Sequence, residues 1–537
     1  MESTTYSSKT LDHLGLVAGM CREIGISEVI DSSYEEQSAD QIVSNGKALE
    51  AMILNGLGFV NKRLYLIPQF YEDKPVDILL GEGFEAAHFN DDRLGRALDA
   101  FYDSGVTALF AKLSRRTFEV LGYQPSRGHL DTTSLSVYGH YNSEAENPVE
   151  LHITPGYSKD QRPDLAQAVL QLICDHLSGI PVHMEVLDGN SNDSVSFREV
   201  IQNFGQQLRT TDGLRTIVAD SKLYSAETIK ALKDCNLNWI CRVPGSIDAV
   251  KTLLEEIKAE ELTPLTVEGY SSACYTYDYA GIDQHWVVYH SQSAAQREAM
   301  ALKRQLDREC ADAEKSLKKL SRERFHCQED AQKAAQKWNQ NWKWYQLQQL
   351  ALTTHTEHDR AGRPDAQAKP LTSYSISGKL GYDEKAYAAA IFKRSLFVIA
   401  TNEEINTLSE QEALLNTYKE QHQVEQGFRF IKDPNIVASS FYVKKPQRVE
   451  ALLFVMASCL LVYSALEYRI RQSLEKSDKS LPDQKGKPTK RPTARWVFQL
   501  FVGIHVLRLP DGNKITLNLK TEHRDILSLL SYWNFYS

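Results

Sequence analysis

Apolar and polar residues change their period along the chain, and these changes divide it into regions. Up to about residue 125, apolar residues recur at intervals of three and four, as in VSNGKALEAMILNGLGF (43–59), which predicts amphipathic helices. Asn90 precedes Asp91 and Asp92 at the start of another such run, which indicates a helix N-cap followed by an acidic first turn. We therefore expect residues 1–125 to form a helical domain.

From residue 126 the pattern changes to short runs rich in β-branched and apolar residues, typical of strands. Ser225 opens a helical stretch, SAETIKALKD, as an N-cap with Thr228 in place of the usual Glu or Gln of a capping box. Strands and helices in this order predict a mixed α/β sheet over residues 126–245. The candidate strands are GHLDTTSLSVYG (128–139), NPVELHITPGY (147–157), IPVHMEVLDGN (180–190), TIVAD (216–220) and NWICRV (238–243).

Residues 246–392 interrupt this sheet. They begin with two strand-like runs, ACYTYDYAG (273–281) and QHWVVYHS (284–291), and continue as a polar stretch from about 294 to 350. Its charges alternate in sign, which predicts a solvated helix or helical hairpin. The simplest interpretation is a surface arm without chemistry, followed by a loop at 355–370.

Residues 393–445 return to the sheet with the strand SLFVIATN (395–402), and TLSEQEALLNTYKEQHQVEQGFRFIKD (407–433) is predicted as one long helix stopped by Pro434. In the last region, 446–537, the uncharged run 451–466 is shorter than the roughly 20 residues that a membrane span needs. We therefore predict a buried core helix there, further C-terminal helices and no membrane association.

Charge and cysteine content narrow the function only slightly. The formal net charge is -9 and the pI about 6.0, whereas dedicated nucleic-acid binders are often basic; an acidic total can still hide a basic surface. Residues 469–495 hold nine Lys or Arg against three Asp or Glu, which fits either a solvated linker or a contact with nucleic-acid phosphates. The eight cysteines form no CxxC pair or zinc-like cluster, so we predict reduced thiols in a cytosolic protein.

Three carboxylates lie at positions that suggest chemistry. Asp131 lies within a predicted strand, where an acid is costly unless it is paired or binds a cation. Asp220 ends another strand, at the edge where open α/β sheets place ligand sites. Glu425 lies on the helix at 407–433. If the two strands are neighbours and the helix crosses them, the three can converge, and an oxygen-only cluster suits magnesium or manganese.

Each acid also has an ordinary structural interpretation, as a turn residue, a cap or a solvated side chain. The surroundings of Glu425 bear on this choice. Tyr418, Gln421, Glu425, Arg429 and Lys432 follow helical spacing and form one stripe on a continuous helix. In the functional interpretation, such a stripe binds phosphate groups beside a metal ion. In the structural interpretation, Glu425 and Arg429 form an ordinary ion pair on the solvent-exposed face of the helix.

The spacing of Tyr418, Glu425 and Lys432 resembles Y-x2-R-x3-E-x6-K, the signature around the catalytic glutamate of bacterial insertion-sequence DDE transposases. HLDTTSLSVYG resembles the first-aspartate strand of that group, and IVADSKLYS its second-aspartate segment. GYSKDQRPDL (156–165) and LDGNSNDS (187–194) resemble its connecting segments. The N-terminal LNGLGFVNKRLYLIPQFYEDKPVDILLGEG and NDDRLGRALD resemble the N-terminal domain of one branch. The likeness follows the same order over most of the chain.

This resemblance implies an RNase H-like core, a mixed five-stranded sheet flanked by helices, divided by an insertion between the second aspartate and the glutamate. The sequence leaves room for it, with 205 residues between Asp220 and Glu425 against 89 between the aspartates. By resemblance, Asp131, Asp220 and Glu425 would hold two divalent ions, Mg²⁺ or Mn²⁺. Tyr418 and Lys432 would contact phosphates near the cleaved end.

Gln421 stands where the signature has arginine. His422 and Arg429 are the candidate substitutes for the missing charge, although Arg429 lies one turn beyond Glu425. Relatives of this architecture also place an aromatic residue of the insertion against a flipped base. Trp286, Trp338, Trp342 and Trp344 are available, with packing as the expected role of each.

The resemblance implies a reaction in which water attacks the phosphodiester at the element's end, and the freed 3′-OH attacks target DNA. Metal ions would provide the activation, so no His or Lys base is required. We expect binding of double-stranded DNA at terminal inverted repeats through the N-terminal domain, a dimer in the DNA complex, and a bacterial cytoplasmic, nucleoid-associated location. The alternatives are a metal nuclease of the same fold that cuts without joining, and a non-catalytic DNA-binding protein descended from a transposase. A structural coiled-coil protein would explain only residues 294–350.

Overall fold

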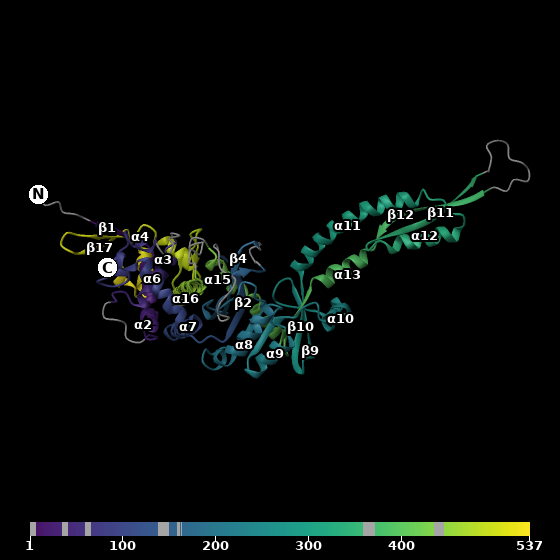
Figure 1. Ribbon diagram of the computed structural model, residues 1–537. Helices are drawn as coiled ribbons and strands as arrows, with labels where there is room; N and C mark the ends of the chain where they lie inside the picture. The colour runs from purple at the N-terminus through teal and green to yellow at the C-terminus, as the bar shows by residue number, and fades with distance from the viewer. Residues whose placement is uncertain are drawn as a thin grey trace, which may run out of the picture.

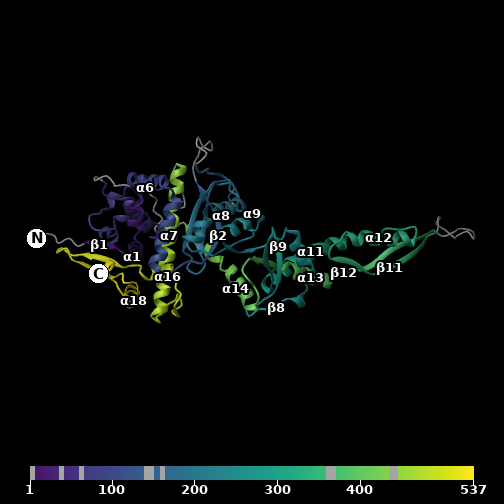
Figure 2. The same ribbon diagram turned by 90° about the horizontal axis from the view of Figure 1, so that it is seen from below.

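The structure is a computed structural model that describes residues 7–34, 41–59, 66–137, 150–157, 162, 164–357, 371–433 and 445–537. The molecule is elongated (Figures 1 and 2). A mainly helical body at one end holds both termini, a large sheet with its helices forms the middle, and an arm projects at the other end.

Five strands of the central sheet lie in the order β5-β4-β2-β6-β7. β2 pairs antiparallel with β4, and β4 with β5, whereas β2, β6 and β7 run parallel. This is the mixed five-stranded arrangement of an RNase H-like core, so the predicted fold class is confirmed. The strands are β2 (Arg127–Val137), β4 (Ala166–Asp175), β5 (Pro181–Leu187), β6 (Thr216–Ala219) and β7 (Asn238–Arg242).

The interrupting region adds strands to this sheet. β13 (Leu396–Thr401) pairs antiparallel with β7, and β10 (Ile282–Ser291) pairs with β13. β9 (Tyr270–Tyr279) and the short β8 (Thr263–Pro264) complete that side. The strands predicted at 238–243, 273–281, 284–291 and 395–402 are therefore confirmed, and they belong to one continuous sheet.

Helices cover both faces of the core sheet. Val218 and Ile240 pack against Leu414 and Leu415 of α14 (Leu408–Lys419) on one face. Because side chains alternate along a strand, their neighbours Ile217, Trp239 and Cys241 point to the other face, where they belong to the same core as α9 (Ala226–Asp234). α8 (Asp193–Thr210) packs beside α9, and α10 (Asp248–Glu256) follows β7. Ser225 caps α9 as predicted, by accepting the Thr228 N–H.

The arm consists of three helices and a two-stranded sheet. Its elements are α11 (Gln292–Leu320), α12 (Gln328–Gln340), β11 (Tyr345–Glu357), β12 (Leu371–Tyr382) and α13 (Glu384–Arg394). The predicted polar helical hairpin is therefore confirmed up to residue 340, but the prediction is wrong at 345–350, where β11 begins. Of the loop predicted at 355–370, residues 355–357 continue β11, and the rest lies outside the described residues.

The N-terminal helices and the C-terminal region pack together as one body. α16 (Pro446–Lys476) contacts α1, α3, α6 and α7, and β1 (Ser7–Thr10) pairs with β16 (His505–Arg508). Asn90 caps α6 as predicted, by accepting the Arg93 N–H. The other elements are α1 (Leu14–Ile24), α2 (Ile26–Asp31), α3 (Asn45–Gly56), α4 (Ile67–Tyr71), α5 (Val76–Leu79), α6 (Asp91–Asp103), α7 (Val106–Leu121), β14 (Leu481–Pro482), β15 (Pro488–Thr489), α17 (Ala494–Leu500), β17 (Lys514–Leu517) and α18 (Thr521–Leu530).

α16 is the core helix predicted at 451–466. Among the described helices it is long and apolar enough to cross a membrane, yet 83% of its apolar window is buried inside the protein. Its neighbours on several sides are the terminal helices, which explains why it is apolar around its whole circumference.

Two strand predictions in the core differ from the structure. β4 (Ala166–Asp175) was not among the candidate strands, although it pairs with β2, β3 and β5. The candidate at 147–157 contributes only β3 (Thr154–Pro155), which pairs with the start of β4; residues 147–149 lie outside the described part. All eight cysteines are free thiols, as predicted.

Candidate active site

The register of two parallel strands brings Asp131 and Asp220 to the same level of the sheet. β2 and β6 pair His129 with Val218. Asp131 lies two residues further along β2, and Asp220 directly follows Ala219, the last residue of β6. Residues in register on neighbouring parallel strands point to the same face, about 4.8 Å apart. The two carboxylates therefore share one face, at the carboxyl end of β6.

Both aspartates are half-buried and held by backbone N–H groups close to them in sequence. Asp131 Oδ1 accepts the Thr132 N–H at 2.7 Å, and Asp220 Oδ1 accepts the Lys222 N–H at 2.8 Å. These bonds fix the orientation of each carboxylate relative to the backbone that carries it.

α14 and α15 (His422–Ile431) cover the face that carries the aspartates. Val218 contacts α14 on that face, and Asp220 lies two residues beyond it. α15 packs on β2 and β4. The helix pair therefore runs across the strands, passing β7 and β6 first and then β2 and β4.

The single long helix predicted at 407–433 is wrong, because it is broken at Glu420 and Gln421. The Gln421 N–H bonds the Tyr418 carbonyl oxygen at 3.2 Å, an i to i−3 contact that tightens the turn. Both residues keep right-handed helical angles, so the chain continues as α15. One continuous stripe from Tyr418 to Lys432 can no longer be assumed. Pro434, the predicted stop, lies outside the described residues.

Glu425 lies on the outer side of α15. Its inward neighbours Val424, Phe428 and Ile431 are buried, whereas the Glu425 side chain is 53% exposed. Its Oε2 lies 3.8 Å from Nη2 of Arg429, whose side chain is 79% exposed. An exposed i,i+4 pair of this kind contributes only a few tenths of a kcal/mol, so it leaves Glu425 able to take another partner.

No group of three His, Cys, Asp or Glu side chains within the described residues is arranged to hold a metal ion. The structure brings the two aspartates together and places the Glu425 helix on their face, but it does not close the three carboxylates into one cluster. The predicted catalytic and metal-binding roles of Asp131, Asp220 and Glu425 stay predictions.

Tyr418 lies near Asp220 and Glu425. Its hydroxyl is largely buried, and burial raises its pKa to about 12, helped by Asp220, Cys241 and Glu425 and opposed by Arg242. The phenol is therefore within electrostatic range of both Asp220 and Glu425. It keeps its proton at neutral pH and can donate a hydrogen bond to a phosphate oxygen.

The other predicted DNA-binding residues also lie on α15 or beside it. Gln421 is the half-buried residue before the helix, and Lys432 follows its last residue. Arg429 lies one turn after Glu425 and pairs with it. His422 opens α15, but its side chain lies outside what the structure describes. None of these positions is placed against DNA, so their roles stay predictions.

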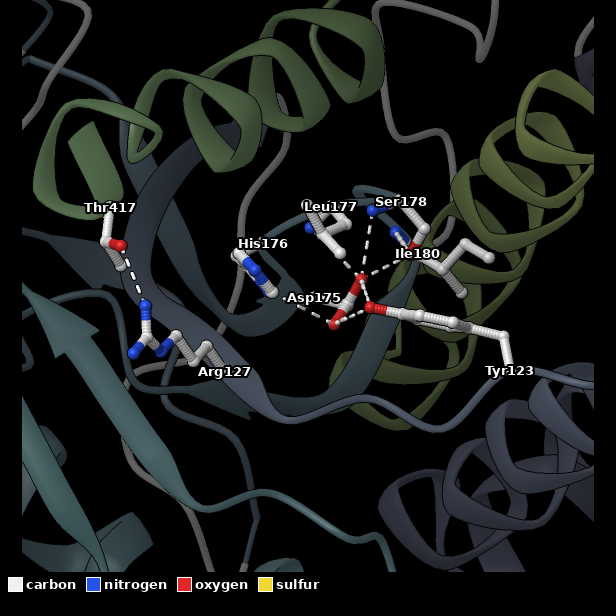
Figure 3. A network of polar contacts seen from close by, with 8 residues as sticks. All are labelled: Tyr123, Arg127, Asp175, His176, Leu177, Ser178, Ile180 and Thr417. Carbon is white, nitrogen blue, oxygen red and sulfur yellow. Dashed lines mark hydrogen bonds and ion pairs between the residues drawn. The ribbon is translucent and has the colours of Figure 1, made fainter. Parts of the chain in front are cut away.

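Arg127 is a site residue that sequence reasoning missed (Figure 3). Its Nη1 donates to Thr417 Oγ1 at 2.9 Å. Its Nη2 lies 3.2 Å from Glu403 Oε2. Glu403 Oε1 accepts the Thr216 hydroxyl at 2.6 Å. Thr417 precedes Tyr418, so this network fixes the end of α14 to the start of β2 and β6. The only sequence signal was a charged residue four positions before Asp131, on the same strand face.

Asp175 fixes the turn beside this anchor (Figure 3). It is fully buried and accepts the Tyr123 hydroxyl at 3.1 Å, and the Ser178 N–H and hydroxyl at 2.9 and 2.8 Å. The His176 ring lies 3.7 Å from the same carboxylate, and the His176 N–H bonds the Arg127 carbonyl oxygen. The role of Asp175 is to hold the β4–β5 connection against the start of β2.

The four tryptophans of the interrupting region all take part in packing. Trp286 is buried in the sheet, stacks on Tyr277 and donates its indole N–H to Tyr224. Trp338, Trp342 and Trp344 belong to the two small cores of the arm. This agrees with the packing role expected for each.

A family model described as "Transposase DDE domain" matches residues 123–462, and one described as a domain of unknown function (DUF4277) matches residues 6–115. No curated protein matches. Among solved structures, a cryo-EM structure of the piggyBac transposase synaptic complex with hairpin DNA matches with TM-score 0.39 and 8% identity, covering 99% of this chain and 88% of that chain.

Proposed function

The chain belongs to the transposase DDE domain family, whose model matches residues 123–462, and from this premise we propose that it is the transposase of an insertion sequence. It cleaves DNA at terminal inverted repeats and joins the freed 3′-OH ends to target DNA. The observation that carries the proposal is the parallel register that sets Asp131 beside Asp220, under the helix pair that bears Glu425.

Divalent metal ions are in general use in this family, and the donor set here fits them. Asp131 and Asp220 offer carboxylate oxygens on one face, which is the ligand chemistry that Mg²⁺ and Mn²⁺ prefer. Glu425 is the proposed third ligand, and it would leave its weak contact with Arg429 to reach the aspartates. Two bound metal ions supply activation of an attacking oxygen and stabilisation of the leaving one.

The remaining residues bind and orient the DNA. Tyr418 keeps its proton and donates a hydrogen bond to a phosphate oxygen, and Lys432 supplies a cation beyond Glu425. Arg127 acts through Thr417 as a positioning residue for this helix pair. In the overall change, water adds to the phosphodiester phosphorus and the 3′-oxygen leaves as a hydroxyl. That hydroxyl then displaces a 3′-oxygen of the target strand.

Two features extend the proposal to partners. Residues 6–115 match a domain of unknown function. The described helices of this region pack with the C-terminal region as one body at the end of the molecule (Figure 2). We assign this body to binding of the inverted repeats. Two ends must be cut and joined in one event, so the active form is a dimer on DNA.

Two other functions use the same residues differently. A metal nuclease with this fold would cut and not join, and a transposase-derived DNA-binding protein would do neither. The second is favoured only by Gln421 at the signature's arginine position. We prefer a catalytic transposase to the non-catalytic protein because Asp131, Asp220 and Glu425 are all present in the sequence.

The test is an assay with labelled DNA carrying the inverted repeats that flank the coding region, a supercoiled target plasmid and Mg²⁺ or Mn²⁺. We expect cleavage at the repeat ends and covalent joining to the plasmid. Cleavage without joining would establish the nuclease instead. Retained activity in Glu425→Gln would remove Glu425 from the site, and binding with no cleavage under any metal would favour the non-catalytic protein.

A further inference from the structure

A groove lined by arginines runs beside the candidate active site. It has a volume of about 700 Å³ and lies between α15, α16 and the segment before α17. Four arginines line it, Arg429 from α15, Arg471 from α16, and Arg491 and Arg495 from the C-terminal segment. Guanidinium groups bind phosphate oxygens through two parallel N–H donors, so the chemistry of the groove favours phosphate.

The carboxylates of the groove neutralise only part of this charge. Arg471 pairs with Glu467 at 2.5 Å and Arg495 with Asp433 at 2.8 Å, and Glu420 also lines the groove. These contacts hold two of the arginines in place.

The other two arginines are available to a ligand. Within the described residues, the one ion pair of Arg429 is the 3.8 Å contact with Glu425. Arg491 is exposed and makes no ion pair within the part of the chain that the structure describes. Arg429 and Arg491 are therefore the groups of the groove that can turn to a phosphate.

Aromatic rings make the base of the groove rigid. Phe430 of α15 lies against Tyr463 of α16, with ring centroids 4.4 Å apart. The Arg495 guanidinium lies 5.6 Å from the centre of the Phe59 ring, and the Arg495 N–H donates to the Tyr463 hydroxyl. A preorganised base of this kind lowers the entropic cost of presenting arginine side chains to a ligand.

The position of the groove suggests which phosphates it meets. Arg429 lies one helical turn from Glu425, at the edge of the catalytic face. Phe59 and α16 belong to the terminal body, which we assigned to the inverted repeats. DNA held by that body and cut at the aspartates has to pass over the groove between them.

We propose that this groove binds the phosphodiester backbone of the transposon-end DNA between the terminal body and the catalytic aspartates, through Arg429 and Arg491. The identity of the DNA rests on the proposed function. The proposal that the groove contacts the backbone of a DNA duplex is independent of the proposed function, because such contacts carry no sequence information.

The experiment measures binding of the full-length protein to a fluorescein-labelled 30-base-pair duplex of arbitrary sequence by fluorescence anisotropy. EDTA prevents cleavage, and KCl is varied so that the slope of log K against log salt counts the phosphates contacted, at about 0.9 per phosphate. The variants are Arg491→Ala, the double variant Arg429→Ala with Arg491→Ala, and Arg491→Lys. Lys230→Ala, at an exposed position of α9 outside the groove, is the charge-matched control.

We expect Arg491→Ala to reduce the slope by about one and the double variant by about two, with a loss of affinity of about 5-fold to 50-fold near 0.1 M salt. Arg491→Lys should keep the slope, and Lys230→Ala should match the wild type. Equal slopes in the double variant and wild type would overturn the proposal, as would an equal loss in Lys230→Ala. Far-UV circular dichroism verifies that each variant is folded.

This outcome can be told apart from failure of the proposed function. If the wild type neither cleaves nor joins repeat-end DNA but the arginine variants change the salt slope, the DNA-binding role of the groove is supported and the transposase proposal is wrong. If cleavage and joining occur and the slope is unchanged, the groove is wrong and the catalytic proposal stands.

Discussion

The two aspartates and the glutamate of the candidate site are positioned by different means. Asp131 and Asp220 are placed by the backbone pairing of β2 with β6, in the middle of a sheet covered on both faces. Glu425 is placed by a ten-residue helix that follows a break at Gln421 and packs through Val424, Phe428 and Ile431. The strands hold their acids by repeated hydrogen bonds, whereas the helix holds its acid by side-chain packing and one anchor at its base.

This difference indicates which part of the site is fixed and which can adjust. A register shift would turn every side chain of a strand to the other face, so the sheet fixes Asp131 within β2 and holds Asp220 directly after the end of β6. The helix pair can tilt by changing a few side-chain contacts. We infer that the aspartates form the fixed part of the site and that α15 completes it when DNA binds.

The largest expected effect comes from the fixed part. Asp131→Asn and Asp220→Asn each keep shape and hydrogen bonding but remove the charge, so we expect cleavage to fall by about a thousandfold, equivalent to about 4 kcal/mol of barrier. The measurement is the single-turnover rate on repeat-end DNA with Mg²⁺. Thermal stability should be unchanged or higher. Near-wild-type cleavage in either variant would remove that aspartate from the site.

The second effect tests the anchor of the adjustable part. Arg127→Ala removes the contacts to Thr417 and Glu403, which should cost about 1.5–3 kcal/mol of stability. It should also slow cleavage by about 10-fold to 100-fold, because small displacements of a reacting group are costly. The matched control is Arg115→Ala, which breaks the 3.3 Å pair with buried Asp212. If both variants lose the same activity at equal stability, Arg127 has no positioning role.

A third, smaller effect concerns the signature position. Gln421→Arg adds a cation at the break between the two helices, next to the proposed phosphate contacts. We expect duplex affinity to rise by about 3-fold to 10-fold near 0.1 M salt and the salt slope to steepen by about one. Asn416→Arg adds the same charge at an exposed position of α14 and should have less effect. A gain equal to that of Asn416→Arg would mean that position 421 does not face DNA.

The smallest effect is on stability of the sheet region and depends on pH. Burial raises the pKa of Glu450 on α16 to about 7. Burial also raises the pKa of Glu185 on β5 to about 7, and the nearby charges of Glu199 and Glu450 add to that shift. Below pH 4.5 both acids are protonated in the folded and unfolded chains, so their burial does not lower the free energy of unfolding through ionisation. As the pH rises through 7, the folded chain must ionise these buried acids, and the free energy of unfolding falls.

Glu450→Gln cannot ionise, so its stability relative to wild type should rise between pH 4.5 and 7 and level off above that range. We expect a gain of about 1–3 kcal/mol at pH 8 and none at pH 4.5, measured by urea unfolding. Glu255→Gln, at an exposed position of α10, should show no such trend. A gain of the same size at every pH would mean that ionisation of Glu450 is not the cause.

Local patterns were enough to predict most elements of the core. The strand that carries Asp131, the strand that ends before Asp220, the caps at Asn90 and Ser225 and the buried α16 follow from periodicity and capping residues. β4 was missed because buried Gln167 and Gln171 interrupt its apolar run; the Gln167 side-chain N–H donates to the distant Gly189 carbonyl oxygen at 2.7 Å. β11 was missed because its exposed, polar sequence follows a long helical arm.

The break at Gln421 illustrates the same limit on a smaller scale. Helical spacing of Tyr418, Glu425 and Lys432 holds for a regular helix, and nothing in the local sequence requires an irregular turn between them. The turn forms where α14 leaves β6 and β7 and α15 meets β2 and β4. The packing of two helices on different strands therefore decides the geometry.

The sequence by itself determined the order of strands and helices, the presence of an acid on each of two strands and one helix, and the resemblance that led to the family. The tertiary structure decided that Asp131 stands beside Asp220, and that Arg127 reaches Thr417, 290 residues away along the chain. It also gathered Arg429 with Arg491 in one groove. The reason is physical: periodicity reports which face of an element is buried, whereas register and side-chain contacts are set between elements distant in the sequence.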